Sequence, residues 1–368
     1  ESRAHMLCGA KRWDEAAQAY AGLRASTAAG ISFLRHGEAD AVAMGGDRAP
    51  AVVVDGVVQA ARDLDLEIVL VGQRDAVQAE LDRHDVAGLS VTIVHASEVI
   101  EMHEHPAAAV KAKKDSSMVV GMDLIKQHEA DAFFTAGNSG GALAAALFRL
   151  GRIRGIQRPA LSTIFPSQTS HGYCFLLDIG ANTDCKPEYL LQFALMGSVY
   201  TERVLGIPNP RVAILSNGEE EGKGNQLVQD TVPLLKASTL NFVGNAEGKD
   251  IPWGLADVIV TDGFTGNVVI KLAEGVSKFL VDVLRQEITS RTLSKVGALL
   301  ARPAFDEIKR RLDYREYGGA PLLGVDGVVI VGHGRSDALA IRNGIRVAAR
   351  TAENKVLEAI KSSMTHYI

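Results

Sequence analysis

A loop that follows the apolar run ending at Leu177 combines side chains well suited to chemistry. It carries Asp178, Asn182, Asp184 and Lys186 among turn-forming residues. Asparagine supplies a neutral donor and acceptor, lysine supplies a mobile positive charge, and glycine lets backbone N–H groups approach a ligand closely. Such a set suits a phosphate group or a developing oxyanion, although a capped strand-to-helix turn explains the same residues.

The same pattern follows other apolar runs of the chain. Glycine occurs with asparagine, aspartate, lysine or histidine at residues 44–47, 135–141, 216–225, 262–267 and 332–335. Each of these loops alone is typical of turn chemistry. If all of them lie at the carboxyl edge of one sheet, where open α/β sheets bind ligands, they indicate one shared site.

Short apolar runs alternate with helical patterns along most of the chain. This alternation predicts an α/β fold with a mostly parallel sheet in a Rossmann-like, three-layer arrangement. Residues 1–36 fit the rhythm poorly, so we expect an extension outside the fold and one domain over residues 37–368. Strands are expected at residues 41–44, 68–71, 91–94, 132–135, 160–165, 174–177, 212–215, 242–243, 258–261 and 328–331. Helices are expected at residues 51–62 and 142–150. Further helices are expected to end near residues 84, 126 and 289, and another is expected to begin near residue 189.

Composition narrows the classes of function. The 368 residues suffice for a large core, and the formal net charge of −5 argues against binding to nucleic acid. Three cysteines form no disulfide framework, which indicates a reducing, cytoplasmic compartment. No stretch approaches the ~18 consecutive apolar residues of a membrane span.

Recognisable cofactor motifs are absent from the sequence. It contains no phosphate-binding glycine fingerprint, no catalytic-serine elbow and no zinc-ligand spacing, so neither a cofactor nor a metal is expected. His103 and His105 form a tempting pair, but a solvated helix start before the next proline is the alternative. Cys185 lies between an aspartate and a lysine, whose effects on its thiol oppose each other, so a structural role competes with that of a nucleophile.

The loops resemble the bacterial phosphate acyltransferase (PlsX) family. The resemblance covers residue 41 to the C-terminus and rests on many ordered motifs. Among them are Leu177-Asp178-Ile179-Gly180-Ala181-Asn182, Asp184-Cys185-Lys186-Pro187-Glu188, Lys223-Gly224-Asn225, Asp262-Gly263-Phe264 and Gly266-Asn267, with further matches at residues 43–47, 114–118, 136–140, 192–197, 218–221 and 316–324.

The resemblance implies transfer of a fatty acyl chain from acyl carrier protein to inorganic phosphate, which yields acyl phosphate for phospholipid synthesis. It implies a fold similar to the isocitrate dehydrogenase and phosphotransacetylase sheets. It also implies a homodimer at the inner face of the cell membrane, in contact with the membrane glycerol-3-phosphate acyltransferase.

With the resemblance in hand, roles can be assigned to the loops as hypotheses. Lys223 and Asn267 would stabilise charge at the reacting centre, with Lys186 and His333 as further candidates. For Lys223 the alternative is a solvated lysine that balances three glutamates. The candidate phosphate-binding residues are Gly45, Gly46, Asp47, Asn138, Ser139, Gly140, Asn182, Asp184, Asn225 and Asp262.

Two departures from the family pattern keep other functions open. Val42 stands where the family usually has aspartate, and Arg48 stands where it usually has histidine. Arg48 could bind the anion in their place, or the chain could be an inactive membrane-bound scaffold. A phosphotransacetylase-like enzyme that uses acyl-coenzyme A is the alternative among enzymes.

Two segments suggest surfaces for partners. Residues 275–312 are more apolar than a solvated helical hairpin needs and are interspersed with lysine and arginine, which indicates a dimer interface, a membrane-facing tip, or both. Arg149, Arg152, Arg154 and Arg158 form a candidate dock for the acidic carrier protein, with a solvated face as the alternative.

Overall fold

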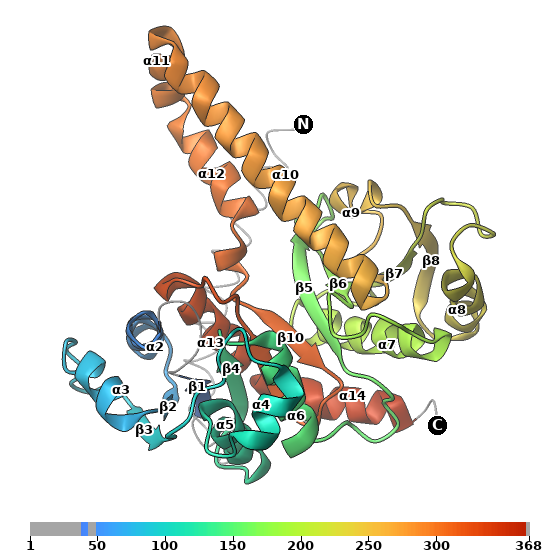
Figure 1. The fold of residues 1–368 in the computed structure, drawn as a ribbon. Helices are drawn as coiled ribbons and strands as arrows, with labels where there is room; N and C mark the ends of the chain where they lie inside the picture. The colour runs from blue at the N-terminus through green and yellow to red at the C-terminus, as the bar shows by residue number, and fades with distance from the viewer. Residues whose placement is uncertain (1–37, 43–48, 366–368) are drawn as a thin grey trace, which may run out of the picture. The chain divides into compact units, whose positions relative to one another are not determined.

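The computed structural model describes residues 38–42 and 49–365, and these contain a mixed sheet of eleven strands (Figure 1). The predicted extension over residues 1–36 lies outside the described residues. The strands are β1 (Glu38–Val42), β2 (Glu67–Gly72), β3 (Val91–His95), β4 (Ala132–Thr135), β5 (Ala160–Pro166), β6 (Tyr173–Leu177), β7 (Arg211–Leu215), β8 (Asn241–Ala246), β9 (Val258–Val260), β10 (Ala320–Leu323) and β11 (Val328–Val331).

Helices connect most of these strands. They are α2 (Ala51–Asp63), α3 (Arg74–Leu81), α4 (Pro106–Ala112), α5 (Ser117–Lys126), α6 (Ser139–Arg149), α7 (Pro187–Arg203), α8 (Gln226–Ala237), α9 (Asp250–Trp253), α10 (Gly263–Ser290), α11 (Thr292–Leu300), α12 (Arg302–Leu312), the short 3₁₀ helix η1 (Tyr314–Glu316), α13 (Ala338–Glu353) and α14 (Val356–Thr365).

The sheet consists of two parallel blocks that run in opposite directions. Its strand order is β3-β2-β1-β4-β11-β10-β5-β6-β9-β7-β8. β10 pairs antiparallel with β11 and with β5, and β5 pairs antiparallel with β6, whereas the other pairings of the sheet are parallel. The predicted mostly parallel sheet is confirmed. Three antiparallel steps reverse the direction, so strands β6, β9, β7 and β8 run opposite to the β1–β4 and β11 block.

Burial on both faces explains the continuous apolar runs of the strands. Phe133 and Phe134 are consecutive in β4 and point to opposite faces, as the twofold period of a strand requires. Phe133 packs with α5 and α6, while Phe134 packs with α2 and α13, and both are at most 1% exposed. Ala145 and Ala146 of α6 are fully buried, so these small residues of the helix pack in the core. The predicted three-layer arrangement follows from this packing.

Some predicted boundaries differ from those observed. The single helix expected to run through Lys126 is divided into α4 and α5, because residues 113–116 turn there and Asp115 accepts hydrogen bonds from the backbone and hydroxyl of Ser97. β10 was not expected, because its four residues include Pro321 and follow two glycines. The first strand begins at Glu38, earlier than predicted, and residues 43–48 lie outside the described residues.

Helices α10, α11 and α12 follow one another as a hairpin (Figure 1). The buried residues of the 28-residue α10 are Gly263 and Gly266, both in its first turn, and α11 has none. Leu293, Leu299 and Leu300 of α11 are 84%, 69% and 80% exposed. No helix within the described part of the chain is both long enough and apolar enough to cross a membrane. The hairpin is therefore an amphipathic element, and many of its apolar side chains are exposed in the described part of the chain.

An ion pair between the buried Asp257 and the half-buried Arg211 stabilises the second block of the sheet. Asp257 is 6% exposed, and its carboxylate accepts bonds from Arg211 Nη2 (3.0 Å), Nε (3.1 Å) and backbone N (2.9 Å). Burial works to raise the pKa of Asp257, but the hydrogen bonds from Arg211 outweigh it and hold that pKa below its usual value. The pair joins the start of β7 to the start of β9.

We expect Asp257→Asn to lower the free energy of unfolding by about 2 kcal/mol at pH 7. This loss is smaller than the loss expected on breaking a fully buried ion pair, because Arg211 is partly exposed. The folded pKa lies below the unfolded one, so this stabilisation is present above about pH 4 and is lost as the pH falls through the folded pKa. Urea unfolding of the unchanged protein and of the Asp257→Asn variant, at pH 7 and near pH 3, measures the difference in stability. A difference that stays constant over this range would contradict the assignment.

Candidate active site

The loop between β6 and α7 is organised around the buried carboxylate of Asp178. Its Oδ1 accepts from the backbone N–H groups of Gly180 (3.0 Å), Ala181 (2.9 Å) and Leu161 (3.1 Å). Its Oδ2 accepts from the backbone N (2.7 Å) and side-chain Nδ2 (2.8 Å) of Asn182. Burial raises the pKa of Asp178, and these hydrogen bonds oppose the rise. Asp178 therefore holds the loop in shape and has no capacity left for a ligand.

Asn182 ties this loop to two other segments. Besides binding Asp178, its Nδ2 donates to the backbone carbonyl of Pro159 at 2.7 Å, and its own carbonyl accepts from Gly263 N at 2.7 Å. Asn182 was predicted to bind phosphate, but its side-chain N–H groups already donate to Pro159 and Asp178. The contribution of Pro159 could not be found from the sequence, because nothing local marks it as a neighbour of this loop.

The junction between β9 and α10 packs directly against the same loop. Asp262 caps α10 by accepting from Thr265 N at 2.9 Å. Asn267 is exposed, and its Nδ2 donates to the carbonyl of Ile179 at 3.1 Å. A Cβ atom on Gly266 would lie 1.9 Å from the carbonyl oxygen of Asp178, so only glycine fits there. This close approach places Asn267 beside residues 178–182.

The third loop, between β7 and α8, presents Lys223. Asn225 caps α8 by accepting from Val228 N at 3.0 Å, and Asn217 accepts from Gly224 N at 2.8 Å. The backbone of Lys223 is held by a hydrogen bond to Glu220 O at 3.0 Å, while its side chain is exposed. The loop is thus anchored on both sides of a lysine that faces solvent.

These three loops share one edge of the sheet. β6, β9 and β7 are adjacent and parallel, so their carboxyl ends meet at the same edge. Lys186, Lys223 and Asn267 are exposed there, and the exposed Asp184 lies in the first loop. Two cations and an amide donor near three helix starts can bind an anion and stabilise a developing negative charge. We call this set the β6–β9–β7 edge.

Asn138, Ser139, Gly140 and His333 lie at the opposite edge of the sheet. Asn138 follows β4, and its side chain caps α6 through Gly141 N (3.0 Å) while its Nδ2 donates to carbonyls of residues 101, 102 and 104. Ser139 is exposed, and Gly140 packs against Pro106. His333 follows β11, and its Nδ1 accepts from Arg335 N at 3.1 Å.

The condition for one shared site, that all of these loops lie at one edge of the sheet, is therefore not met. The antiparallel strands β10 and β5 reverse the sheet between β11 and β6, which separates the two sets of loops. We call the second set, after β4 and β11, the β4–β11 edge. Gly45, Gly46, Asp47 and Arg48, which were expected to join the site, lie outside the described residues, and of Val42 only the backbone, at the end of β1, is described.

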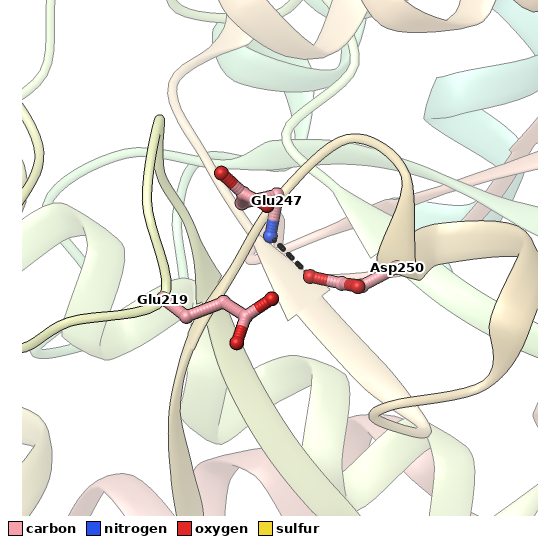
Figure 2. Close-up of side chains that lie close together, drawn as sticks. All are labelled: Glu219, Glu247 and Asp250. Atoms are coloured by element: carbon pink, nitrogen blue, oxygen red, sulfur yellow. Dashed lines mark hydrogen bonds between the residues drawn. The ribbon is translucent and has the colours of Figure 1, made fainter.

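An acidic cluster near β8 holds a lysine. Figure 2 shows Glu219, Glu247 and Asp250 converging, and Asp250 accepts from Glu247 N at 2.8 Å. Lys249 Nζ lies 3.0 Å from Glu219 and also contacts the carboxylate of Glu247. Its hydrogen bonds to Glu247 and Glu219 raise the pKa of Lys249. The ammonium group of Lys249 therefore balances part of the negative charge of these carboxylates, and we assign no metal to them.

The cysteine and histidine candidates have structural surroundings. Burial raises the pKa of Cys185 to about 12, and its Sγ lies 3.7 Å from the carbonyl of Asn182. A thiol with such a pKa is a poor nucleophile, which favours the structural alternative. His103 and His105 are both exposed, and helix α4 begins directly after them at Pro106, as the solvated-helix-start alternative predicts.

Comparisons with known proteins agree with the fold and with the resemblance of the loops. Residues 40–359 match the family described as fatty acid synthesis protein. The phosphate acyltransferase of Dictyoglomus turgidum is 52% identical over 323 residues, which cover 86% of this chain and 96% of the relative. That of Pelotomaculum thermopropionicum is 52% identical over 322 residues, 88% of this chain and 93% of the relative.

A phosphotransacetylase from Streptococcus pyogenes has a similar structure, with a TM-score of 0.58 and 17% identity over 86% of this chain and 94% of that one. This likeness concerns the fold alone, and it confirms the expected similarity to the phosphotransacetylase sheet. Since the family match spans most of the chain and the relatives are about half identical to it, this chain belongs to the fatty acid synthesis protein family, to which the resemblance of its loops to phosphate acyltransferases had pointed.

Proposed function

We propose that this protein is a phosphate acyltransferase that moves a fatty acyl group from acyl carrier protein to inorganic phosphate. The observation that carries the proposal is the 52% identity, over 86% of the chain, with a relative named phosphate acyltransferase. The exposed lysines and amide at the β6–β9–β7 edge support it, because they suit an anionic acceptor. The acyl phosphate product would serve phospholipid synthesis.

The proposed reaction needs no covalent intermediate on the enzyme. A phosphate oxygen attacks the thioester carbonyl carbon, and a tetrahedral oxyanion forms. When it collapses, the carbon–sulfur bond breaks and the carrier-protein thiolate leaves. Because a thiol has a pKa of about 8.5, this leaving group needs little acid assistance. The protein must therefore hold a dianion beside a carbonyl and stabilise the oxyanion.

Lys223 and Asn267 are the proposed groups for stabilising the oxyanion, with Lys186 beside them. Phosphate binding by Asn138, Ser139 and their neighbours would take place at the opposite edge of the same chain. Within one chain the two sets of loops lie at opposite edges of the sheet, and in a homodimer the β6–β9–β7 edge of one copy can face the β4–β11 edge of the other. The unpartnered apolar side chains of α10, which begin three residues before Asn267 at Phe264, support such a dimer.

The chemical test is the release of free thiol from a long-chain acyl carrier protein. We expect release to require inorganic phosphate and to yield an acyl phosphate that hydroxylamine traps. Dependence on the carrier protein separates this reaction from that of a phosphotransacetylase-like enzyme, for which acyl-coenzyme A would be the better donor. A folded dimer that releases no thiol from either donor would favour the scaffold alternative and point to Val42 and Arg48.

We further propose that the protein lies peripherally on the inner face of the cell membrane, where it would meet the membrane glycerol-3-phosphate acyltransferase. The tip helix α11 supports this proposal, because its leucines are exposed and Lys295 adds positive charge among them. The longer α10 has room for a dimer contact nearer the sheet. The two surfaces are thus compatible in one hairpin.

Leu299→Asp is expected to reduce binding to vesicles that contain anionic lipid by about tenfold or more, because it places a charge where an apolar side chain would enter the lipid. Co-sedimentation with vesicles measures the binding, and light scattering checks the dimer. Gln286→Glu, which adds the same charge on α10, is the control and should bind normally. Equal binding by both variants and the unchanged protein would count against a membrane role for α11.

A further inference from the structure

Residues 151–159, which connect α6 to β5, form a ridge with arginines on its outer side. Ile153 and Ile156 are 2% and 4% exposed and anchor the segment in the core. Arg152, Arg154 and Arg158 are exposed. The segment is therefore an irregular connection whose apolar side chains point inward and whose cations point outward.

The ridge is held in place by hydrogen bonds on both sides. Ile153 N donates to Gly324 O at 3.1 Å, just after β10. Gln192 of α7 accepts from Gln157 N at 2.8 Å and donates to Gly155 O at 3.0 Å. Arg152 Nη1 donates to the carbonyl of Gln157 within the segment. The three arginines are thus displayed on a fixed backbone, which lowers the entropy lost when a partner binds.

The charge of the ridge is not compensated locally. Arg149, which the sequence grouped with these arginines, forms a bidentate pair with Asp123 and so is not available. Within the described residues, Arg152, Arg154 and Arg158 form no ion pair with a carboxylate. The whole chain has a formal net charge of −5, so three unpaired cations within seven residues stand out against an acidic background. Such a patch attracts an acidic partner.

The ridge adjoins the β6–β9–β7 edge. The carbonyl of Pro159, next to Arg158, accepts from Asn182 Nδ2 at 2.7 Å. Two residues further on, Leu161 N donates to the carboxylate of Asp178 at 3.1 Å. The last arginine is therefore one residue from a direct contact with the loop that carries Lys186. A partner docked on the ridge would lie beside the proposed reacting centre.

The composition of the ridge favours a protein partner over a lipid surface. A membrane-binding segment combines basic residues with exposed apolar side chains that enter the lipid. Within residues 151–159 the exposed positions are arginine, glycine and glutamine, while the isoleucines and the proline are buried. Charge without an apolar anchor suits the carboxylates of another protein's surface.

We propose that Arg152, Arg154 and Arg158 form the docking surface for the acidic carrier protein that delivers the acyl thioester. This inference rests on the proposed function and specifies where its protein substrate binds. Arginine can hold carboxylates through two parallel hydrogen bonds, so docking would fix the orientation of the partner as well as attract it.

Reversal of the three charges tests the surface. In the combined variant Arg152→Glu, Arg154→Glu and Arg158→Glu, we expect the KM for acyl carrier protein to rise at least ~10-fold. The kcat and the KM for phosphate should stay unchanged. A small thioester donor, acyl-pantetheine, should react equally with both proteins. Salt should raise the KM of the unchanged protein and leave that of the variant nearly constant.

The control is Lys126→Glu, Arg203→Glu and Lys355→Glu, which makes the same change in net charge at exposed positions elsewhere. It should keep a normal KM. An unchanged KM in the ridge variant would overturn the proposal, and so would loss of vesicle binding with a normal KM, which would assign the ridge to lipid. If the unchanged protein turns over no donor at all, the proposed function itself fails. This result is distinct from the two outcomes that would overturn the docking surface alone.

Discussion

Gly266→Ala is expected to lower the free energy of unfolding by about 3 kcal/mol and to abolish turnover. The added Cβ would lie 1.9 Å from the carbonyl oxygen of Asp178 and 3.0 Å from its carbonyl carbon. Both are backbone atoms, which cannot move aside as a flexible side chain can. The first turn of α10 would have to separate from residues 178–182, and Asn267 would move with it.

Urea unfolding measures the loss of stability, and thiol release measures the activity. The control lies in the same helix, because a Cβ on Gly275 would meet no atom within 4 Å. Gly275→Ala should therefore stabilise the helix by up to about 1 kcal/mol and leave turnover intact. A Gly266→Ala protein as stable and as active as Gly275→Ala would show that α10 and the β6–α7 loop are not packed as described.

Lys223→Ala is expected to reduce kcat about 10²–10³-fold with little loss of stability, because an exposed side chain is removed whose proposed role is to stabilise the oxyanion. Its backbone hydrogen bond to Glu220 remains, so the loop should keep its conformation. Steady-state kinetics with acyl carrier protein and phosphate measure the effect. Lys236→Ala is the matched control, since Lys236 forms a surface pair with Glu221; this variant should have a normal kcat.

The same variant can test whether two copies share a site. If the β6–β9–β7 edge of one copy serves the β4–β11 edge of the other, mixing Lys223→Ala with an inactive His333→Ala protein should restore activity. Random mixing gives half of the dimers as hybrids, each with one intact site, so about a quarter of normal activity is expected. Normal turnover by Lys223→Ala alone would remove this lysine from the reacting centre, and no recovery in the mixture would place each site within one chain.

The strands and helices of this protein are largely determined by local sequence. β4 begins and ends where its apolar run predicted, and α2, α7 and α10 lie close to their expected positions. The physical reason is that runs such as Phe175-Leu176-Leu177 are fully buried. A strand buried on both faces needs apolar residues at every position, so its sequence is recognisable. β10 was missed because its short run, with proline inside, carries no such pattern.

The chemical character of the loops was also readable from the sequence, but their grouping was not. Lys223, Asn267 and Lys186 do share an edge, since β6, β9 and β7 are neighbours. His333 and Asn138 are separated from them by the antiparallel strands β10 and β5, whose pairing joins residues more than a hundred positions apart. No local pattern encodes the direction in which a strand enters a sheet.

The sequence by itself determined the family, the α/β class and the side chains available for binding an anion, because these follow from residue types and their spacing. Tertiary structure alone decided which polar groups are already used and which face outward. It buried Asp178 beneath five N–H donors and paired Arg149 with Asp123. It left Arg152, Arg154 and Arg158 beside the loop of Asn182 with no carboxylate partner among the described residues. Hydrogen bonds and ion pairs between distant segments form only once the chain has folded, so the sequence presents both kinds of arginine alike.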